Sequence, residues 1–358
     1  MPLSLGIIGL PNVGKSTLFN ALTKLSIPSE NYPFTTIEPN IAVVEVPDER
    51  LLKIKEITEA EIVNNIHLQF IDIAGLVKGA HKGEGLGNKF LSQIREVDAL
   101  IHIVRLFEDE KVEKIGGSNF LDNVEIINTE LILKDIEMLA KIRLKLEKNL
   151  KGSRDIKLKE EYELTKRISE SLDQGKLLRE LSLTEEELKI IKEYNLLTSK
   201  PLLYVFNLGE GEMKGDLNLN GLGCDTQVIS FCIKVEEELS KLSKEEAGLF
   251  REELGIKNYP LNDLIKKAYD ALNLITYFTI EKGKLSAWSI KEGTTAKEAA
   301  GKVHSDMEKG FIAAEVISYL VLKEIGDISE IKKKGLICQE GKQYQVKDGD
   351  IICFKFSL

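Results

Sequence analysis

The stretch Leu5–Thr17, LGIIGLPNVGKST, dominates the fold prediction for this chain. An apolar run ends at Gly9, the pattern Gly-x-x-x-x-Gly-Lys-Ser begins there, and helix-forming residues follow. This order predicts a buried strand, a glycine-rich turn and a helix start, in which backbone N–H groups and the helix N-terminus surround phosphate oxygens. Lys15 is expected to reach the β- and γ-phosphates, and the Ser16 hydroxyl is expected to ligate Mg²⁺. The stretch therefore predicts nucleotide binding.

The composition sets wide bounds on the rest of the molecule. The 358 residues are 43% hydrophobic and 30% charged, which is ordinary for a globular protein and sufficient for two or three domains. The net charge of −9 excludes a global attraction to nucleic acid or to anionic membranes, so any RNA contact must be local. No apolar run approaches about 18 residues, and the apolar N-terminus lacks a basic leader, so we expect no membrane span and no signal peptide.

The cysteines indicate a reducing compartment. They show no Cys-x-x-Cys spacing and lie in or beside apolar segments, at Cys224, Cys232, Cys338 and Cys353. Reduced, buried thiols in a cytoplasmic protein are the expectation.

Two later segments carry groups that suit a metal–nucleotide site. Segment 27–40 contains three prolines and the pair Thr35-Thr36, so it reads as a loop in which one threonine could complete a Mg²⁺ shell. The predicted strand Ile66–Ile73 ends in Asp72, which can hold a metal-bound water, and Gly75 can offer its N–H to a γ-phosphate.

The segment after Gly75 resembles a switch loop that lacks its usual catalytic group. Five glycines fall within residues 75–87, interleaved with charged residues, so we expect this segment to be mobile without nucleotide or partner. Leu76 stands where Ras-like enzymes carry the glutamine that orients water, and an apolar side chain cannot polarise water. Hydrolysis must then be slow, use another group, or require a partner. His81 is one candidate, the alternative is a solvated loop histidine, and the catalytic group stays unknown.

The α/β pattern is interrupted by a helical segment. Strands are predicted at Ile41–Val46, Asp98–Phe107, Leu202–Phe206 and Gln227–Cys232. Between them, from about Asn128 to Leu197, apolar residues recur at helical spacing with charges of both signs on the other faces. We expect two long antiparallel helices, a coiled-coil arm, and a third helix opened by a capping box at Thr184. The basic residues of the arm form either a solvated face or a local nucleic-acid surface.

The end of strand Leu202–Phe206 carries the predicted base-recognition motif. GTPases have Asn-Lys-x-Asp there, and the aspartate accepts both guanine donors; here the residues are Asn207-Leu208-Gly209-Glu210. A carboxylate displaced by one methylene leaves guanine donors unpaired, at a cost of roughly 1–3 kcal/mol. We therefore expect guanine specificity to be relaxed or lost.

The C-terminal segment changes character and predicts a separate small domain. Residues 236–274 read as helical with breaks at Gly255 and Pro260; from Thr276 a hairpin, a helix from Thr294, an apolar strand at Val316–Val321 and a strand pair within Tyr344–Phe356 follow. A sheet over one helix indicates a ubiquitin-like, β-grasp domain. The predicted division is 1–127 with 199–275 for nucleotide binding, 128–198 for the inserted arm, and 276–358 for the C-terminal domain.

Several motifs in the same order resemble the YchF/Obg-like ATPase family over nearly the whole chain. They are GLPNVGKST at 9–17, NYPFTTIEPN at 31–40, DIAGLVKGAHKGEGLGNKFL at 72–91, VEIINTEL at 124–131, NLGE at 207–210, LNLITYFT at 272–279, AWSIKEGTTAKEAAGKVHSDMEKGFIAAEVI at 287–317 and YQVKDGDII at 344–352.

The resemblance implies an α/β P-loop nucleotidase, a G-domain of three layers with an inserted coiled-coil arm and a C-terminal TGS domain. It implies a slow ATPase that prefers ATP and binds ribosomes, as the large subunit or the whole ribosome, through the arm and the TGS domain. Carried over by position, the nucleotide-binding residues are Asn12, Val13, Gly14, Lys15, Ser16, Thr17, Gly75, Asn207, Leu208 and Glu210. The Mg²⁺ residues are Ser16, Thr36 and Asp72. Asn12 matches an asparagine that lets related enzymes bind K⁺, so K⁺ stimulation is a hypothesis.

Two departures and two alternative functions complete the sequence-based interpretation. Thr35 replaces a cysteine that many members carry, which puts redox control in doubt, and Lys114 is nearest by position to a histidine considered catalytic in some members. The alternatives to a slow ATPase are a GTPase of relaxed base specificity and a non-enzymatic, nucleotide-gated scaffold that binds ribosome or RNA.

Overall fold

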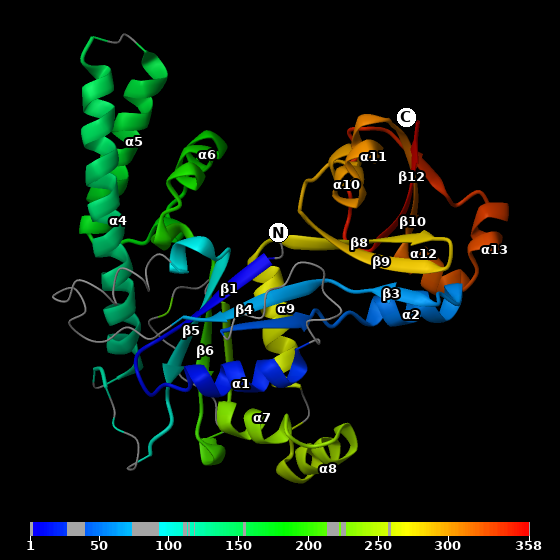
Figure 1. The fold of residues 1–358 in the computed structure, drawn as a ribbon, viewed down its shortest axis with the longest axis horizontal. Coiled ribbons are helices and arrows are strands. Elements are labelled where there is room, and N and C mark those ends of the chain that lie inside the picture. Colours follow the sequence, from blue (N-terminus) through cyan, green and yellow to red (C-terminus); the bar gives the residue numbers. More distant parts are fainter. Residues whose placement is uncertain are drawn as a thin grey trace.

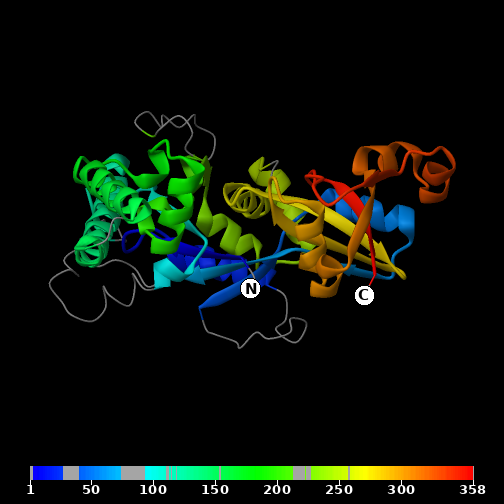
Figure 2. The same cartoon turned by 90° about the horizontal axis from the view of Figure 1, so that it is seen from above.

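Two six-stranded sheets organise the protein in a computed structural model. The structure describes residues 3–26, 40–73, 93–109, 113, 115–117, 119–152, 155–212, 222, 227–256 and 259–357. Figure 1 shows the first sheet at the centre, with a helical arm on one side and the second sheet on the other. In the perpendicular view the arm and the second sheet again lie at opposite ends of the molecule (Figure 2).

The first sheet has the strand order β2–β4–β1–β5–β6–β7, and only β2 runs antiparallel to its neighbour. Its strands are β1 (Leu3–Ile8), β2 (Ile41–Glu45), β4 (His67–Asp72), β5 (Ala99–Arg105), β6 (Leu202–Asn207) and β7 (Gln227–Phe231). All seven residues of β5 are buried, as expected for a strand covered on both faces. Since the carboxyl ends of parallel strands meet at one edge, the ends of β1, β4 and β6 lie together there.

Short helices follow the strands of this sheet along the chain. They are α1 (Lys15–Leu25), α2 (Glu49–Thr58), α7 (Ile233–Leu239), α8 (Lys244–Leu254) and α9 (Pro260–Ala271). Gly255 ends α8 in the left-handed conformation and Pro260 opens α9, as the sequence predicts. A further break between α7 and α8 was not predicted; there Ser243 and Glu246 form a capping box that starts α8 anew.

The inserted segment forms the predicted antiparallel helical pair. Its helices are α4 (Phe120–Leu150), α5 (Ile156–Asp173) and α6 (Glu185–Tyr194), and Thr184 caps α6 as expected. Helix α4 begins well before Asn128, because Asn119 and Asp122 form a capping box. Its first turns pack on the sheet, where Val124 contacts a cluster of Val104, Tyr204 and Phe206. The outer part of the arm has its own small core, which includes Leu139, Leu164 and Ile168.

The junction of arm and sheet, which we call the arm root, is held by buried polar groups. Asp135 of α4 is fully buried and accepts hydrogen bonds from Leu197 N (2.9 Å), Thr198 N (2.7 Å) and Thr198 Oγ1 (2.7 Å). Lys200 is also buried, and its ammonium donates to the carbonyls of Arg95 and Val97 and to Asn195 Oδ1. Fully satisfied networks of this kind fix the geometry of a joint.

The second sheet has the order β11–β10–β12–β8–β9–β3 and packs on helix α10 (Ala296–Val303). Its strands are β3 (Ile62–Asn64), β8 (Leu274–Glu281), β9 (Lys284–Lys291), β10 (Phe311–Ser318), β11 (Cys338–Glu340) and β12 (Asp350–Phe356). The remaining helices are α11 (Ser305–Lys309), α12 (Tyr319–Ile325) and α13 (Ile328–Lys333). The predicted hairpin corresponds to β8 and β9.

Two strand predictions in this region are wrong. The predicted strand Val316–Val321 ends at Ser318, because that side chain accepts a hydrogen bond from Leu320 N and caps α12. Within Tyr344–Phe356 the structure has one strand, β12, in place of the predicted pair. The turn that precedes β12 is closed by Asp350, the first residue of the strand, whose side chain accepts hydrogen bonds from Lys347 N and from the Tyr344 hydroxyl.

The first sheet and the second sheet are joined by a strand as well as by side chains. Strand β3 follows α2 but pairs in parallel with β9, and Asn64 Nδ2 donates to Ser286 Oγ at 3.1 Å. Arg50 of α2 contacts Asp48 at 2.8 Å and Asp348 at 2.5 Å, and so bridges the two parts.

Two further sequence expectations concern cysteines and membranes. Cys232 is buried, but Cys338 and Cys353 are exposed, because both lie on strands with a solvent-facing side; Cys224 is outside the described residues. Within the described ranges, no helix is long and apolar enough to cross a membrane.

Candidate functional site

The glycines of the phosphate loop are required by close backbone approaches. Gly9 and Gly14 have φ values of 152° and 106°, in the region that favours glycine. A Cβ on Gly9 would lie 2.6 Å from the carbonyl oxygen of Ile103, and one on Gly14 would lie 2.5 Å from Asn207 Nδ2. Both contacts are too short for any other residue, so the loop passes tightly over the ends of β5 and β6.

Lys15 opens helix α1 and turns back over the loop. Its side chain is buried, and its ammonium donates to the carbonyls of Gly9 at 3.1 Å and Leu10 at 2.7 Å. Burial lowers the pKa of Lys15, while the nearby Asp72 carboxylate acts in the opposite direction. Together with the N–H groups at the start of α1, this cation makes the loop a ready anion site.

Ser16 and Asp72 come together as the sequence predicts. Ser16 Oγ donates to Asp72 Oδ2 at 3.5 Å, across the gap between α1 and the end of β4. Burial raises the pKa of Asp72, and Lys15 and Ser16 partly offset this. One hydroxyl and one carboxylate are hard oxygen donors of the kind Mg²⁺ accepts when phosphates and waters fill its remaining positions. These two groups therefore fit a divalent metal held mainly by a nucleotide.

Asn207 braces the phosphate loop against the rest of the sheet. Its Nδ2 donates to the Val13 carbonyl at 2.9 Å, and its Oδ1 accepts from Ile233 N, the first residue of α7, at 3.0 Å. Asn207 is itself buried, so both ends of its amide are used internally. The side chain predicted to lie at the base thus also fixes the relative position of α1 and α7.

The rest of the predicted base motif lies beside Asn207. Leu208 is buried and its N–H donates to the Phe231 carbonyl at 3.0 Å, while Gly209 N donates to Glu212 Oε2 at 2.8 Å. Glu210 pairs with Lys234 at 3.1 Å, and both side chains are well exposed. Exposed ion pairs contribute little energy, so this carboxylate is available to an incoming base.

Asn12, the K⁺ candidate, lies exposed on the loop with a positive φ of 62°. Its Nδ2 donates to the Glu113 carbonyl at 3.4 Å. Val13 is buried behind it and Thr17 lies half-buried in the first turn of α1.

Arg105 and Phe107 were not singled out in the sequence, although they border the site. Arg105 stacks on the Phe107 ring at 4.2 Å and donates to the carbonyls of Phe107, Asp109 and Glu113. The backbone N–H of Phe107 donates to the Asn207 carbonyl at 3.2 Å. The sequence signal that could have found Arg105 is a charged residue at the end of a largely apolar, buried strand, at the sheet edge where the site lies.

Several predicted residues lie outside the described part of the chain. These are Thr35, Thr36, Gly75, Leu76, His81 and Lys114. The structure thus brings together the phosphate loop, Asp72 and the motif 207–210, and their further companions stay predictions. Among the described residues, no group of three or more histidine, cysteine, aspartate or glutamate side chains is placed to hold a metal ion.

Comparison with known proteins adds full-length relatives. The chain is 45% identical to the ribosome-binding ATPase YchF of Bacillus subtilis, with 100% of each chain covered. It is 46% identical to the protein of the same name from Mycoplasma genitalium and 42% identical to that of Escherichia coli O157:H7, over at least 99% of each chain.

Family models and a solved structure agree with these relatives. Residues 4–139 match a model described as "50S ribosome-binding GTPase", and residues 274–357 match YchF-GTPase_C, described as "Protein of unknown function (DUF933)". The structure of the Schizosaccharomyces pombe YchF GTPase superimposes with a TM-score of 0.87 at 34% identity, covering 99% of this chain and 97% of that one.

Proposed function

This chain belongs to the YchF family, and we propose on that basis that it is a ribosome-binding ATPase that hydrolyses ATP slowly and serves as a nucleotide-dependent switch. The observation that carries the proposal is the convergence of three elements at one sheet edge. The phosphate loop, Asp72 and Asn207 come from distant parts of the sequence and are linked through Lys15, Ser16 and Val13.

Lys15 and the N-terminus of α1 would bind the phosphates. Residues 12–17 would present backbone N–H groups to the phosphates, and Lys15 would exchange its bonds to carbonyls for stronger bonds to phosphate oxygens. Burial lowers the pKa of Lys15, and the charge of a bound phosphate would favour its protonated form, as the Asp72 carboxylate already does. Gly75 would add its N–H to the γ-phosphate.

A divalent metal is expected with the nucleotide, and we propose Mg²⁺. Ser16 would ligate it directly, Asp72 would hold one of its waters, and Thr36 would complete the shell. When bound, the metal neutralises phosphate charge; the protein's own part is to position the hydroxyl and the carboxylate. K⁺ beside Asn12 is a further part of this proposal, and equal rates in Na⁺ and K⁺ would exclude it.

Adenine is proposed as the preferred base. Leu208 offers an apolar contact in place of the charged side chain of GTPases, and Glu210 replaces the shorter aspartate. A site that cannot pair both guanine donors discriminates against guanine, because unpaired buried donors are costly. Competition binding of ATP and GTP tests this, and a preference for GTP would contradict it.

The ribosome is the proposed partner, bound as the large subunit or the whole particle through the arm, 128–198, and the C-terminal domain, 276–358. The full-length match to ribosome-binding ATPases supports the partner, and a ribosomal partner implies a cytoplasmic location. The negative net charge supports local contacts with ribosomal components rather than general RNA binding.

Two measurements separate this proposal from its alternatives. Co-sedimentation with purified ribosomes, with and without a non-hydrolysable ATP analogue, is expected to show nucleotide-dependent binding. Single-turnover hydrolysis of ATP is expected to be slow alone and faster with ribosomes. Binding without hydrolysis under either condition would instead favour the nucleotide-gated scaffold.

A further inference from the structure

The far end of the helical arm has a charge opposite to that of the whole molecule. We call residues 138–159 the arm tip; they comprise the outer part of α4, the turn after it and the first turn of α5 (Figure 1). The basic residues of the tip are Lys141, Arg143, Lys145, Lys148, Lys151, Arg154, Lys157 and Lys159, and its acidic residues are Glu147 and Asp155. The chain as a whole has a net charge of −9, so positive charge is concentrated at the tip.

The sign of the charge changes along one helix. The inner part of α4, residues 120–137, has a single basic residue, Lys134, and carboxylates at Asp122, Glu125, Glu130, Asp135 and Glu137. The outer part has the reverse composition, with Glu147 as its single carboxylate. A helix that only faces water commonly mixes both signs, because opposite charges three or four residues apart stabilise it. The separation of the signs along α4 indicates that its outer part faces a negatively charged partner.

Three lysines of the tip share one side of α4. Lys141, Lys145 and Lys148 follow one another at intervals of four and three residues, on the side of the helix opposite the buried Leu139 and Leu146. All three lysines are exposed. Like charges at this spacing repel each other and slightly destabilise the helix. A ligand that carries several negative charges would remove this repulsion.

The exposed lysines of the tip have no ion pairs within the described ranges. Those lysines are Lys141, Lys145, Lys148, Lys151, Lys157 and Lys159. The ion pairs of the described part of the arm join Lys134 to Glu137 and Arg167 to Glu187, and both lie inward of the tip. The ammonium groups of the tip are therefore available to a partner.

The two carboxylates of the tip are engaged in other contacts. Glu147 accepts a hydrogen bond from the Tyr162 hydroxyl at 2.9 Å. Asp155 accepts one from Lys157 N at 2.9 Å and so caps α5. These contacts hold the end of the helical pair together, and they leave the positive charge of the tip in excess.

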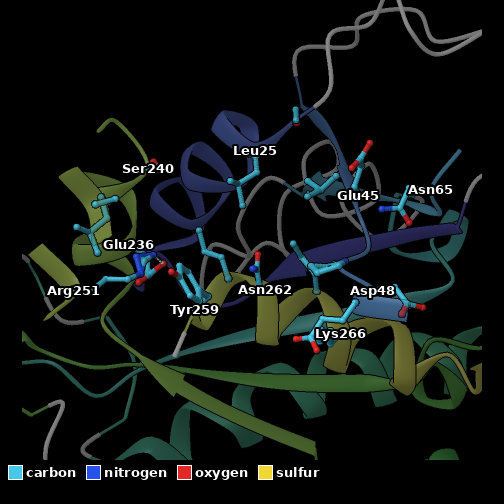
Figure 3. A pocket seen from close by; sticks show the side chains of 18 of the residues that line it. Leu25, Glu45, Asp48, Asn65, Glu236, Ser240, Arg251, Tyr259, Asn262 and Lys266 are labelled. Atoms are coloured by element: carbon cyan, nitrogen blue, oxygen red, sulfur yellow. Dashed lines mark hydrogen bonds and ion pairs between the residues drawn. The ribbon is translucent and has the colours of Figure 1, made fainter. Parts of the chain in front are cut away.

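A charged cleft elsewhere in the molecule shows the contrast. This cleft, with a volume of about 970 Å³, is lined by α1, α7, α8 and α9 (Figure 3). Its buried Glu236 pairs with Arg251 at 2.8 Å, and its Asp48 pairs with Arg50, also at 2.8 Å. These charges are neutralised inside the protein and offer little to a partner, whereas the lysines of the arm tip are not neutralised in this way.

The arm tip is also remote from the proposed nucleotide site. The first turns of α4 pack on the first sheet through Val124, and Lys141 lies about 30 Å along the helix from Phe120. The lysines of the tip therefore cannot contact a nucleotide bound at the phosphate loop. They would bind a second, separate polyanion.

The chemistry of the tip fits the sugar–phosphate backbone of double-helical RNA. Lysine binds phosphate as a point charge, and each contact gains free energy because counterions are released from the nucleic acid. Residues 138–159 include no phenylalanine, tryptophan or tyrosine, so the bases of a single strand would find no aromatic side chain on which to stack. Helical RNA is bound mainly through its shape and its backbone, for which lysines suffice.

We propose that the arm tip binds the phosphate backbone of double-helical RNA, and that this is the contact of the arm with the ribosome. The choice of RNA as the polyanion rests on the ribosomal partner of the proposed function. Lys141, Lys145 and Lys148 would face neighbouring phosphates, and the lysines around the end of the arm would extend the contact. Because a backbone contact reads no bases, this binding carries no sequence preference.

The test uses the full-length chain and a fluorescent RNA duplex of about 20 base pairs. Fluorescence anisotropy between about 50 and 200 mM salt gives the affinity and its salt dependence. The triple substitution Lys141→Gln/Lys145→Gln/Lys148→Gln is expected to lower the affinity at least about tenfold and to reduce the slope of log K against log salt by about 2 to 3. Glutamine forms helices about as well as lysine, so the melting temperature should not fall.

Two control variants localise the effect. Lys176→Gln/Lys189→Gln/Lys192→Gln removes the same charge from exposed positions of the arm outside the tip, and duplex affinity is expected to stay within about twofold of the wild type. Leu144→Gln changes a 59% exposed apolar side chain among the three lysines and should have an equally small effect, because the proposed contact is electrostatic.

Co-sedimentation of the same variants with ribosomes separates this inference from the proposed function. Equal ribosome binding by the wild type and both lysine variants would overturn the role of the tip and leave the ribosomal partner in place. Duplex binding through the tip without any ribosome binding by the wild type would instead overturn the ribosomal partner and leave the tip as an RNA-binding surface.

The duplex titration itself has four results that would overturn the inference. The first is no duplex binding by the wild type at about 50 mM salt. The second is equal affinity and equal salt slope in the wild type and the tip variant. The third is a loss in Leu144→Gln as large as that in the lysine variant, which would indicate an apolar protein contact. The fourth is binding of polyglutamate as tight as that of the duplex, which would indicate an acidic protein partner.

Discussion

Two buried lysines show how differently the molecule treats a cation in two of its regions. Lys15 in the phosphate loop is 9% exposed and Lys200 at the arm root is 8% exposed. The ammonium of Lys200 donates to three acceptors within 3.0 Å, which uses all its hydrogens. That of Lys15 donates to two loop carbonyls, and Asp72 lies nearby as a charge. The two lysines are equally buried, but they differ in the number of acceptors around the ammonium group. This number distinguishes Lys200, which has a structural role, from Lys15, which can still bind a ligand.

A third buried basic residue, His102, is neutral in the folded protein. It lies on β5 at the face toward the arm root, with its ring beside Tyr204. Burial, together with the nearby cations Arg179 and Lys15, lowers the pKa of His102 to about 3. The three residues thus show three ways to bury a basic group. Lys15 bonds to carbonyls that a ligand can replace, Lys200 uses all its hydrogens within the protein, and His102 is neutral.

The largest expected effect is the loss of nucleotide binding on Lys15→Ala. The affinity for ATP should fall at least about a hundredfold, because a charge-assisted contact to phosphate is lost. The free energy of unfolding should also fall, because the buried carbonyls of Gly9 and Leu10 lose a donor. Isothermal titration with ATP and urea unfolding measure the two quantities. Retained ATP affinity would overturn the assignment of Lys15.

Lys200→Met should lower the free energy of unfolding but leave ATP binding intact. The carbonyls of Arg95 and Val97 would lose their shared donor inside the protein, at a cost of about 2 kcal/mol in unfolding free energy. ATP affinity should remain within about twofold of the wild type, because Lys200 is remote from the loop. Lys241→Met, which removes an exposed cation paired with the half-buried Glu237, is the control and should cost less than about 1 kcal/mol.

The neutral state of His102 predicts a pH dependence of stability. The unfolded chain takes up a proton near pH 6.5, whereas the folded chain does so only near pH 3, so the unfolded state binds more protons between these values. The contribution of His102 is therefore full above pH 6.5 and declines as the pH falls toward 3, by up to about 1.4 kcal/mol per pH unit. Urea unfolding of the wild type and His102→Gln between about pH 5 and pH 7 should give a shallower slope for the variant. Parallel slopes would show that His102 is charged in the fold.

The smallest expected effect concerns the base. Glu210→Asp should shift the ratio of ATP to GTP affinity toward GTP by about fivefold, since the shorter carboxylate restores the depth that guanine requires. Competition with a fluorescent nucleotide measures the ratio. Glu238→Asp, on an exposed position of α7, is the control and should leave the ratio unchanged. An unaltered ratio in Glu210→Asp would remove Glu210 from base selection.

The features that the sequence predicts well are those held by local contacts. The phosphate loop follows from glycines whose neighbours are fixed by one strand and one helix, and the breaks at Gly255 and Pro260 follow from their own backbone preferences. The approach of Asp72 to Ser16 also follows, because strand ends of a parallel sheet share an edge.

The features that it misses depend on distant partners. Strand β3 has three residues and no pattern of its own, and its ladder exists only because β9 lies beside it. The capping boxes at Asn119 and Ser243 compete with the apolar pattern that was used to place helix boundaries. The bonds of Arg105 to loop carbonyls are invisible in a sequence, because backbone atoms carry no residue identity.

The pairing of β3 with β9 has a consequence for handling the protein in pieces. The edge strand of the C-terminal sheet, β3, comes from the N-terminal part of the chain. The backbone N–H groups of Glu61 and Ile62 also donate to the Gly283 carbonyl. A fragment cut at the predicted boundary, Thr276, would expose β9 as an unprotected edge. Exposed edges of this kind pair with strands of neighbouring molecules, so the isolated C-terminal fragment should self-associate. Addition of a peptide with residues 49–66 should reduce this self-association, because it supplies β3 to the open edge.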